Sequence, residues 1–282
     1  MQVERARELG LCYGVRRAVR LLREAAAKHG QLETLGPIAH NRLLLAELES
    51  LGIRTINDAE QLSGPVVVVS AHGVSPLVMS DLAARGFEVV DTTCPNVSRV
   101  QILARKLAAE GFSIVVFGEA NHTEVKGLLG WGGKEAVPAL TASDVMAAYG
   151  GTPPRKVAVI VQTTQRAHDF AAFAQELSAM LLSDIEELRF VNTRCTATEM
   201  RQAAARKLAQ SVDVVLVIGG YNSANTRRLA ETCSSLVETH HIEDAAELRE
   251  EWVRGRQRVG ITAGASTPDS SIEKLEERLR SL

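Results

Sequence analysis

Several features that mark common protein classes are missing from this sequence of 282 residues. No apolar run approaches the roughly 18 to 20 residues that a membrane-spanning helix needs. The formal net charge of −2 argues against general nucleic-acid binding, which usually requires a basic surface. The first residues, MQVERARE, are charged and unlike a secretory signal. We therefore expect an ordinary soluble protein of the cytoplasm.

Cysteine is scarce, and the glycine-rich nucleotide fingerprints are absent. Four cysteines without paired short spacings do not resemble a disulfide framework, which again favours a reducing compartment. The segments GEANHTEV and GGYNSAN lack the G-x-G-x-x-G spacing, so no flavin or nicotinamide site is predicted. The length exceeds that of a usual single core, so two or three small domains are expected.

Three of the four cysteines occupy the same kind of position. In FEVVDTTCPNV, a strand pattern leads to Cys94, and Pro95 then takes the first position of a helix. The segment ELRFVNTRCT repeats this form before Cys195, and VERARELGLCYGV repeats it more loosely before Cys12. Because a helix N-terminus favours a thiolate, each is a candidate ligand or nucleophile. A single cysteine of this kind could equally be a buried packing residue.

The recurrence of the cysteine segment indicates three similar units. The three cysteines are 82 and 101 residues apart, and each opens a helical pattern, at residues 15–28, 97–110 and 198–210. The predicted domains are residues 13–95, residues 96–193, and residues 194–282 together with 1–12. The third unit lacks a closing strand at its C-terminal end, so we expect Gln2 to Arg7 to supply it.

Polar turns follow two strands of each unit. Alternation of strands and helices predicts α/β units with parallel sheets and helices on both faces, and such sheets bind ligands at the carboxyl ends of their strands. If the three units face a common centre, these polar residues surround the three cysteines. They are His40, His122, Glu124, Ser223 and Asn225 in the first turns and His72, Thr163 and Ser266 in the second.

Three thiolates and a ring of hydrogen-bond donors restrict the chemistry. Structural zinc normally takes four protein ligands, whereas a four-iron cluster on three cysteines would leave one iron open to a substrate oxygen. The fourth cysteine, Cys233, lies in an amphipathic helical pattern and is expected to pack in a core. Three histidines with serine, threonine and asparagine could hold a phosphate or diphosphate. Taken singly, these residues often only cap helices or lie on the surface.

Nine motifs together carry a resemblance over essentially the whole chain. They are GLCYGV, IAHN, SAHGVS, DTTCP, NHTEV, QTTQ, RCTAT followed by Arg201-Gln202, NSAN and TAGAST. Their order resembles that in the 4-hydroxy-3-methylbut-2-enyl diphosphate reductase family of the non-mevalonate isoprenoid pathway. The resemblance implies a trefoil-like, pseudo-threefold α/β protein around a central [4Fe-4S] cluster. It also implies reductive removal of the substrate C4 hydroxyl, which yields isopentenyl and dimethylallyl diphosphates.

The resemblance also implies roles for individual residues. Cys12, Cys94 and Cys195 match the cluster ligands, Glu124 matches the proton-delivering acid, and Thr163 matches the residue that hydrogen-bonds the substrate hydroxyl. The diphosphate site is matched by His40, His72, His122, Ser223, Asn225 and Ser266. A ferredoxin or flavodoxin is the implied electron donor, and we expect a monomer.

Three positions depart from the family pattern. Ala224 stands where a second serine is common, and Arg194 stands where an apolar residue is usual, with Glu199 nearby. Two alternative functions stay open at this point. One is another three-cysteine cluster enzyme such as quinolinate synthase, against which the NHTEV and TAGAST turns argue. The other is a non-enzymatic iron–sulfur redox sensor, which would have little use for Glu124 and Thr163.

Overall fold

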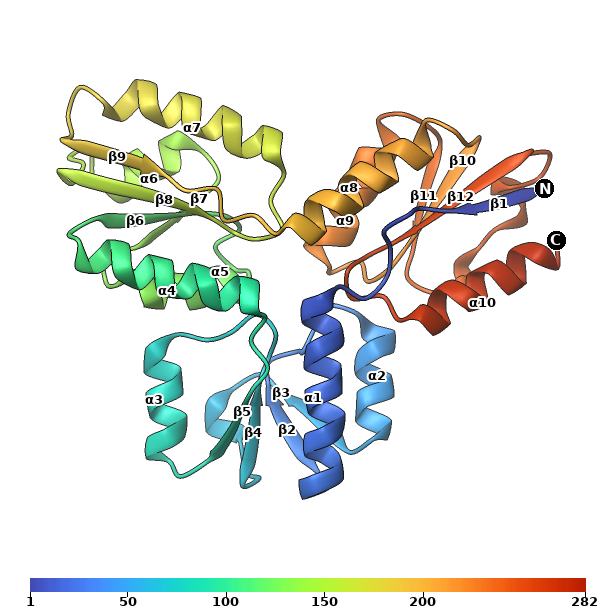
Figure 1. Cartoon of the computed structure of the whole chain (residues 1–282), viewed down its shortest axis with the longest axis horizontal. Coiled ribbons are helices and arrows are strands. Elements are labelled where there is room, and N and C mark those ends of the chain that lie inside the picture. The colour runs from blue at the N-terminus through green and yellow to red at the C-terminus, as the bar shows by residue number, and fades with distance from the viewer. The chain divides into compact units, whose positions relative to one another are not determined.

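The computed structural model describes residues 1–282 and contains three four-stranded parallel sheets connected by helices (Figure 1). The strand orders are β3-β2-β4-β5, β7-β6-β8-β9 and β11-β10-β12-β1. In each sheet a short edge strand, two central strands and a closing strand follow in the same order. This recurrence confirms the predicted fold class of three similar parallel-sheet α/β units. The predicted arrangement of the units around a common centre stays a prediction.

By its internal contacts the chain divides into two compact units. Unit 1 comprises residues 1–32, 37–57 and 196–282, and unit 2 comprises residues 33–36 and 58–195. The predicted domain boundaries at 13–95, 96–193, and 194–282 with 1–12 follow the three sheets instead, and they stay a prediction.

Unit 2 contains the sheet around β6 and β8, with helices on both of its faces. Alternate residues of β6 point in opposite directions: Ile114 and Val116 pack with α4 and α5, whereas Val115 and Phe117 pack with α6 and α7. Figure 1 shows α7 and α4 on opposite sides of these strands. The elements are α4 (Pro95–Ala109), β6 (Ser113–Phe117), α5 (Thr123–Gly132), β7 (Val137–Ala139), α6 (Ala142–Ala148), β8 (Lys156–Val161), α7 (Ala167–Leu181) and β9 (Glu187–Phe190).

Unit 1 contains the sheet around β10 and β12. One face of this sheet packs against α10, and the other packs against α8 and α9. β1 (Gln2–Arg5) pairs in parallel with β12, from Gln2 beside Arg258 to Arg5 beside Ile261. The prediction that the N-terminal segment closes the third sheet is therefore confirmed. The remaining elements are α8 (Thr196–Ala209), β10 (Val214–Ile218), α9 (Ala224–Ser234), β11 (Thr239–Ile242), β12 (Arg258–Ala263) and α10 (Asp269–Arg280).

The remaining sheet has β2 and β4 at its centre. β4 is a run of four valines that are all buried, as expected for a parallel strand covered on both faces. β2 and β5 both pair with β4 in parallel. The elements are α1 (Tyr13–His29), β2 (Leu32–Leu35), α2 (Arg42–Ser50), β3 (Ile53–Ile56), β4 (Val66–Val69), α3 (Pro76–Ala84) and β5 (Glu88–Asp91).

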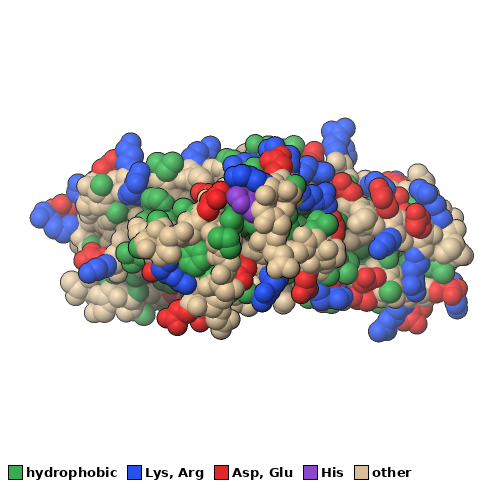
Figure 2. Space-filling view, turned by 90° about the horizontal axis from the view of Figure 1, so that it is seen from below, with side chains coloured by type: hydrophobic (Ala, Val, Ile, Leu, Met, Phe, Trp, Pro, Cys, Tyr) green, Lys and Arg blue, Asp and Glu red, His purple; other side chains and the backbone are tan.

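On the face shown in Figure 2, acidic and basic side chains are interspersed, and neither sign forms one continuous patch. Helices of the length and apolar character needed to cross a membrane are not found in the structure.

Candidate functional site

The three repeated cysteines are held by the same backbone hydrogen bond. The N–H group of each donates to the carbonyl of the second residue after a central strand: Cys94 to Ala71 at 3.0 Å, Cys195 to Thr163 at 2.9 Å, and Cys12 to Ala265 at 2.9 Å. Each cysteine directly precedes a helix, namely α4, α8 and α1. All three cysteines are half-buried. The fold therefore places each sulfur at a helix start, where the partial positive charge favours a thiolate.

Threonine hydroxyls fix two of the segments that lead to the cysteines. Thr92 Oγ1 donates to Val69 O at 2.6 Å, and Thr193 Oγ1 donates to Val161 O at 2.5 Å. Both hydroxyls are buried and bond the last residue of a central strand. The shared threonine of DTTC and NTRC thus has a structural role, because it attaches the cysteine segment to the sheet.

Glu124 and Thr163 form a buried pair in unit 2. Glu124 is only 2% exposed and lies in the first turn of α5, while Thr163 follows β8. The Thr163 N–H donates to Glu124 Oε1 at 2.7 Å, and Thr163 Oγ1 donates to Oε2 at 2.8 Å. A glutamate that merely caps its own helix would reach back to that helix's N-terminus. This carboxyl instead binds a residue of another segment, so it is held in one orientation.

Two of the predicted histidines lie side by side in unit 2. The rings of His72 and His122 are 5.5 Å apart and nearly perpendicular. His122 caps α5, and its Nδ1 accepts the N–H of Glu124 at 3.2 Å. Because an accepting Nδ1 carries no proton, the neutral ring must hold its proton on Nε2. Its Nε2 is therefore the ring nitrogen that can donate a hydrogen bond.

A glutamine that the sequence analysis did not single out organises the same turn. Gln162 is fully buried, and its Oε1 accepts the Glu119 N–H and the Gln165 side-chain amide, both at 3.1 Å. Its Nε2 donates to Thr164 Oγ1 at 3.2 Å. A Cβ at Gly118 would lie 2.7 Å from Gln162 Oε1, so this position requires glycine. The first glutamine of the QTTQ motif was the available signal for this role.

The corresponding turn of unit 1 contains Ser223 and Asn225. Ser223 caps α9 by accepting the Thr226 N–H at 3.3 Å, which leaves its own hydroxyl proton to donate. Asn225 is 4% exposed, and neither its amide nitrogen nor its amide oxygen has a hydrogen-bond partner in the protein. Buried amides are nearly always paired, so an unpaired amide at this position calls for an explanation.

His40 and Ser266 approach each other and the same turn of unit 1. Ser266 Oγ donates to the His40 carbonyl at 3.4 Å. A Cβ at Gly220 would lie only 2.4 Å from that carbonyl, which explains the glycine.

Cys12 follows two residues after Gly10, whose carbonyl accepts Arg201 Nη2 at 3.1 Å. Arg201 is buried, and its Nε has no partner; its role was not evident from the motif in which it occurs.

Four further residues singled out in the sequence are Cys233 and the three departures from the family pattern. Cys233 is fully buried in a hydrophobic cluster with Leu229, and burial raises the pKa of its thiol to about 11. Its predicted packing role is therefore confirmed. Arg194, one of the departures from the family pattern, donates from Nε to Asn192 Oδ1 at 3.1 Å. The side chain of Ala224 is buried at the start of α9. No structural consequence of Glu199 is evident.

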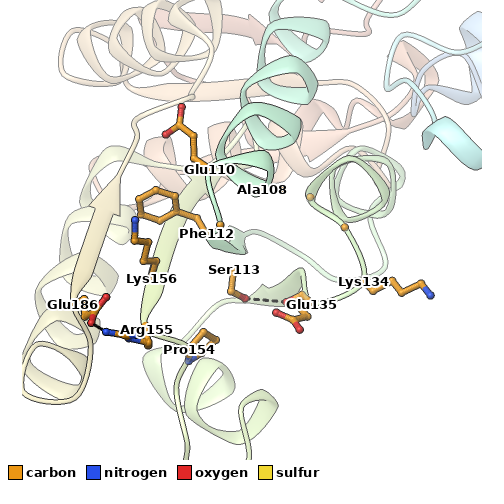
Figure 3. Close-up of a pocket in the computed structure, with 13 residues that line it drawn as sticks. Ala108, Glu110, Phe112, Ser113, Lys134, Glu135, Pro154, Arg155, Lys156 and Glu186 are labelled. Atoms are coloured by element: carbon orange, nitrogen blue, oxygen red, sulfur yellow. Dashed lines mark hydrogen bonds and ion pairs between the residues drawn. The ribbon is translucent and has the colours of Figure 1, made fainter.

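A cavity of about 640 Å³ opens in unit 2 at the end of the sheet opposite to Glu124 and Thr163 (Figure 3). Ser113 and Lys156, which begin β6 and β8, line it, so it lies at the amino ends of the strands. Two pairs of its polar groups already bind each other: Arg155 with Glu186, and Ser113 Oγ with Glu135 O at 3.1 Å. Ligands of parallel sheets bind at the carboxyl ends, where Glu124 and Thr163 lie. We therefore do not assign function to this cavity.

Comparison with known proteins places the chain among reductases. A family model described as LytB protein matches residues 3–280. A relative from Dehalococcoides mccartyi, named 4-hydroxy-3-methylbut-2-enyl diphosphate reductase, is 42% identical over 100% of this chain and 99% of its own length. A solved structure described as (E)-4-hydroxy-3-methyl-but-2-enyl diphosphate reductase, the terminal enzyme of the non-mevalonate pathway, covers 100% of both chains at 37% identity with a TM-score of 0.74. The Plasmodium falciparum E-1-hydroxy-2-methyl-but-2-enyl-4-diphosphate reductase covers 98% of this chain and 87% of its own, at 25% identity with a TM-score of 0.88.

Proposed function

The chain belongs to the LytB family, and we propose on that premise that it reduces 4-hydroxy-3-methylbut-2-enyl diphosphate to isopentenyl and dimethylallyl diphosphates. The observation that carries this proposal is the match along nearly the whole chain to relatives named for that reaction. The alternatives raised by the sequence, a quinolinate synthase and a redox sensor, receive no support from these comparisons.

We propose that Cys12, Cys94 and Cys195 hold a [4Fe-4S] cluster. The sulfur environments fit metal-bound thiolates, because hydrogen-bond donors point toward two of them. Cys12 Sγ accepts the Val15 N–H at 3.4 Å, and Cys195 Sγ accepts the side-chain amide of Asn96 at 3.2 Å. When bound, such a cluster supplies electrons and one open iron as a Lewis acid.

We propose that the substrate diphosphate binds to Ser223, Asn225 and Ser266 in unit 1 together with His40, His72 and His122. Asn225 supports this best, because its buried amide has no partner in the protein. A phosphate oxygen would accept its N–H group and relieve the cost of that burial. Ser223 and His122 both cap the N-termini of helices, which favour anions.

We propose that Glu124 delivers a proton through Thr163. Removal of the C4 hydroxyl consumes two electrons and two protons and releases one water. A threonine hydroxyl both accepts and donates, so a protonated Glu124 can donate to Thr163 Oγ1 while that hydroxyl donates onward to the leaving oxygen. The 2.8 Å contact between Thr163 Oγ1 and Glu124 Oε2 supports this relay. Burial of the pair limits proton exchange with bulk water.

The electrons must come from a separate protein, since the sequence carries no nicotinamide or flavin fingerprint. A small ferredoxin or flavodoxin is the donor class that we propose, acting on a monomeric enzyme in the cytoplasm. None of the four cysteines is in a disulfide, which fits a reducing compartment.

An anaerobic turnover assay tests the function. The protein, reconstituted with iron and sulfide, is given the hydroxylated diphosphate and a chemical reductant, and the products are resolved by mass spectrometry. Formation of both five-carbon diphosphates, dependent on reductant and substrate, is expected. A loaded cluster without either product would contradict the proposal.

A further inference from the structure

The side chain of Asn96 joins the helix that follows Cys94 to the sulfur of Cys195. Asn96 is the second residue of α4, after Pro95, and its Nδ2 lies 3.2 Å from Cys195 Sγ. The two partners are 99 residues apart in sequence, and both belong to unit 2. The contact therefore links two of the repeated cysteine segments through one side chain.

Both ends of this contact are fixed by the backbone. At the Asn96 end, the Cys94 N–H donates to Ala71 O at 3.0 Å, and the Ser98 N–H donates to Cys94 O at 2.9 Å. At the other end, the Cys195 N–H donates to Thr163 O at 2.9 Å. Asn96 is half-buried, so its amide is partly shielded from water. The bond is consequently a built feature of the site and does not depend on a mobile surface side chain.

The chemistry of the two groups fixes the direction of the bond. A metal-bound thiolate has no hydrogen and can only accept, whereas an asparagine amide offers two N–H donors. An N–H donor withdraws electron density from sulfur and favours the more negatively charged, reduced state of an attached cluster. Cys12 Sγ receives a backbone donor from its own helix, whereas Cys195 Sγ receives a side-chain donor that mutation can remove.

We propose that Asn96 is a positioning residue that raises the reduction potential of the cluster by donating a hydrogen bond to Cys195 Sγ. The inference rests on the proposed cluster and deepens the proposed function. A leucine at this position would fill a similar volume without a donor. If Asn96 only stabilised the first turn of α4, its replacement would leave the reduction potential of the cluster unchanged.

The test is a redox titration of the anaerobically reconstituted holoprotein, followed by visible absorbance and electron paramagnetic resonance. Asn96→Leu should shift the midpoint potential to a more negative value with the iron content of the wild type. Asn192→Leu is the matched control: the Asn192 oxygen accepts from Arg194, and its amide lies three residues before Cys195. The control should keep the wild-type potential. An unchanged potential in Asn96→Leu would overturn the inference even if the wild type turns over normally.

A second measurement tests the hydrogen bond in the wild type, in case Asn96→Leu fails to bind the cluster. In the reduced wild-type holoprotein labelled with ¹⁵N-asparagine, electron–nuclear double resonance should detect a ¹⁵N nucleus coupled to the cluster. The signal should persist in Asn192→Leu. Its absence from the loaded wild type would refute the bond to Cys195, and failure of the wild type to bind any cluster would refute both this inference and the proposed cofactor.

Discussion

The turn after β6 and the turn after β10 occupy the same place in their sheets. They differ in whether their buried polar side chain has a hydrogen-bond partner in the protein. Each has a glycine directly after the strand, a helix-capping residue four positions later, and a buried polar residue two positions after the cap. The buried residue is Glu124 in one turn and Asn225 in the other. Both oxygens of Glu124 accept from Thr163, whereas Asn225 has no partner in the protein.

This difference agrees with the two tasks that we propose for one repeated backbone. A proton donor must be held in a fixed orientation before the substrate arrives, so its hydrogen bonds are supplied by the protein. A residue that binds an anion must keep its donors for the ligand, so the protein leaves them unused. On this proposal the repeated backbone places the side chain, and the choice between glutamate and asparagine decides whether it donates a proton or binds an anion.

The largest effect is expected from replacing the three repeated cysteines. Replacing Cys12, Cys94 or Cys195 with serine should remove nearly all reductase activity and most of the visible absorbance of the reconstituted protein, because each is a proposed cluster ligand. Cys233→Ser is the control, since that thiol is buried in a core. Bleaching by Cys233→Ser with a coloured, active Cys12→Ser would refute the assignment.

Glu124→Gln should have the next largest effect. Loss of the acidic proton should lower turnover by roughly 10² or more, the usual scale for general acid catalysis. Turnover is measured with a chemical reductant so that donor docking does not limit the rate. Thr163→Val sharpens the comparison, since it keeps the N–H bond to Glu124 but removes the hydroxyl relay, and it should also be slow. Near-normal rates in Glu124→Gln would eliminate the catalytic role.

Asn225→Ala should weaken substrate binding while leaving the cluster spectrum unchanged. Loss of a hydrogen bond to a charged group costs about 1.5 to 3 kcal/mol, or roughly 10- to 100-fold in affinity. Stability should not fall, because the amide has no partner in the protein to lose. Asn225→Asp should bind still less tightly, since a carboxylate repels diphosphate. Calorimetry with inorganic diphosphate measures both, and equal affinity in all three proteins would contradict the site.

Sequence reasoning recovered the repeated elements well and the contacts between distant segments poorly. The three strand-to-cysteine segments and the replacement strand β1 follow from local hydrophobic patterns and recurrence. The bond from Asn96 to Cys195 does not, because the partners lie 99 residues apart and neither residue type predicts the other. The same holds for Gln162, whose partner Glu119 becomes a neighbour only when β6 and β8 pair.

The smallest effect concerns the strand that closes the third sheet. Arg5 of β1 donates from Nη2 to Glu276 Oε2 at 2.6 Å, and this hydrogen bond lowers the pKa of the Glu276 carboxyl despite the opposing effect of burial. A lowered folded-state pKa stabilises the protein above the ordinary value of 4.5 and loses that effect as the pH falls through the folded value. The free energy of unfolding of the wild type should exceed that of Glu276→Gln by about 1 kcal/mol or less at pH 7. Urea midpoints that differ equally at pH 7 and pH 3 would contradict this linkage.

The most direct test of the account is Mössbauer spectroscopy of the protein reconstituted anaerobically with ⁵⁷Fe, recorded with and without the hydroxylated diphosphate. We expect four irons per chain, of which one alone changes its isomer shift when the substrate is added, because only three cysteines supply ligands. The same single change should occur in Glu124→Gln, which retains the binding residues. Four irons that all keep their parameters in the presence of substrate would contradict the open site on which the proposed reaction depends.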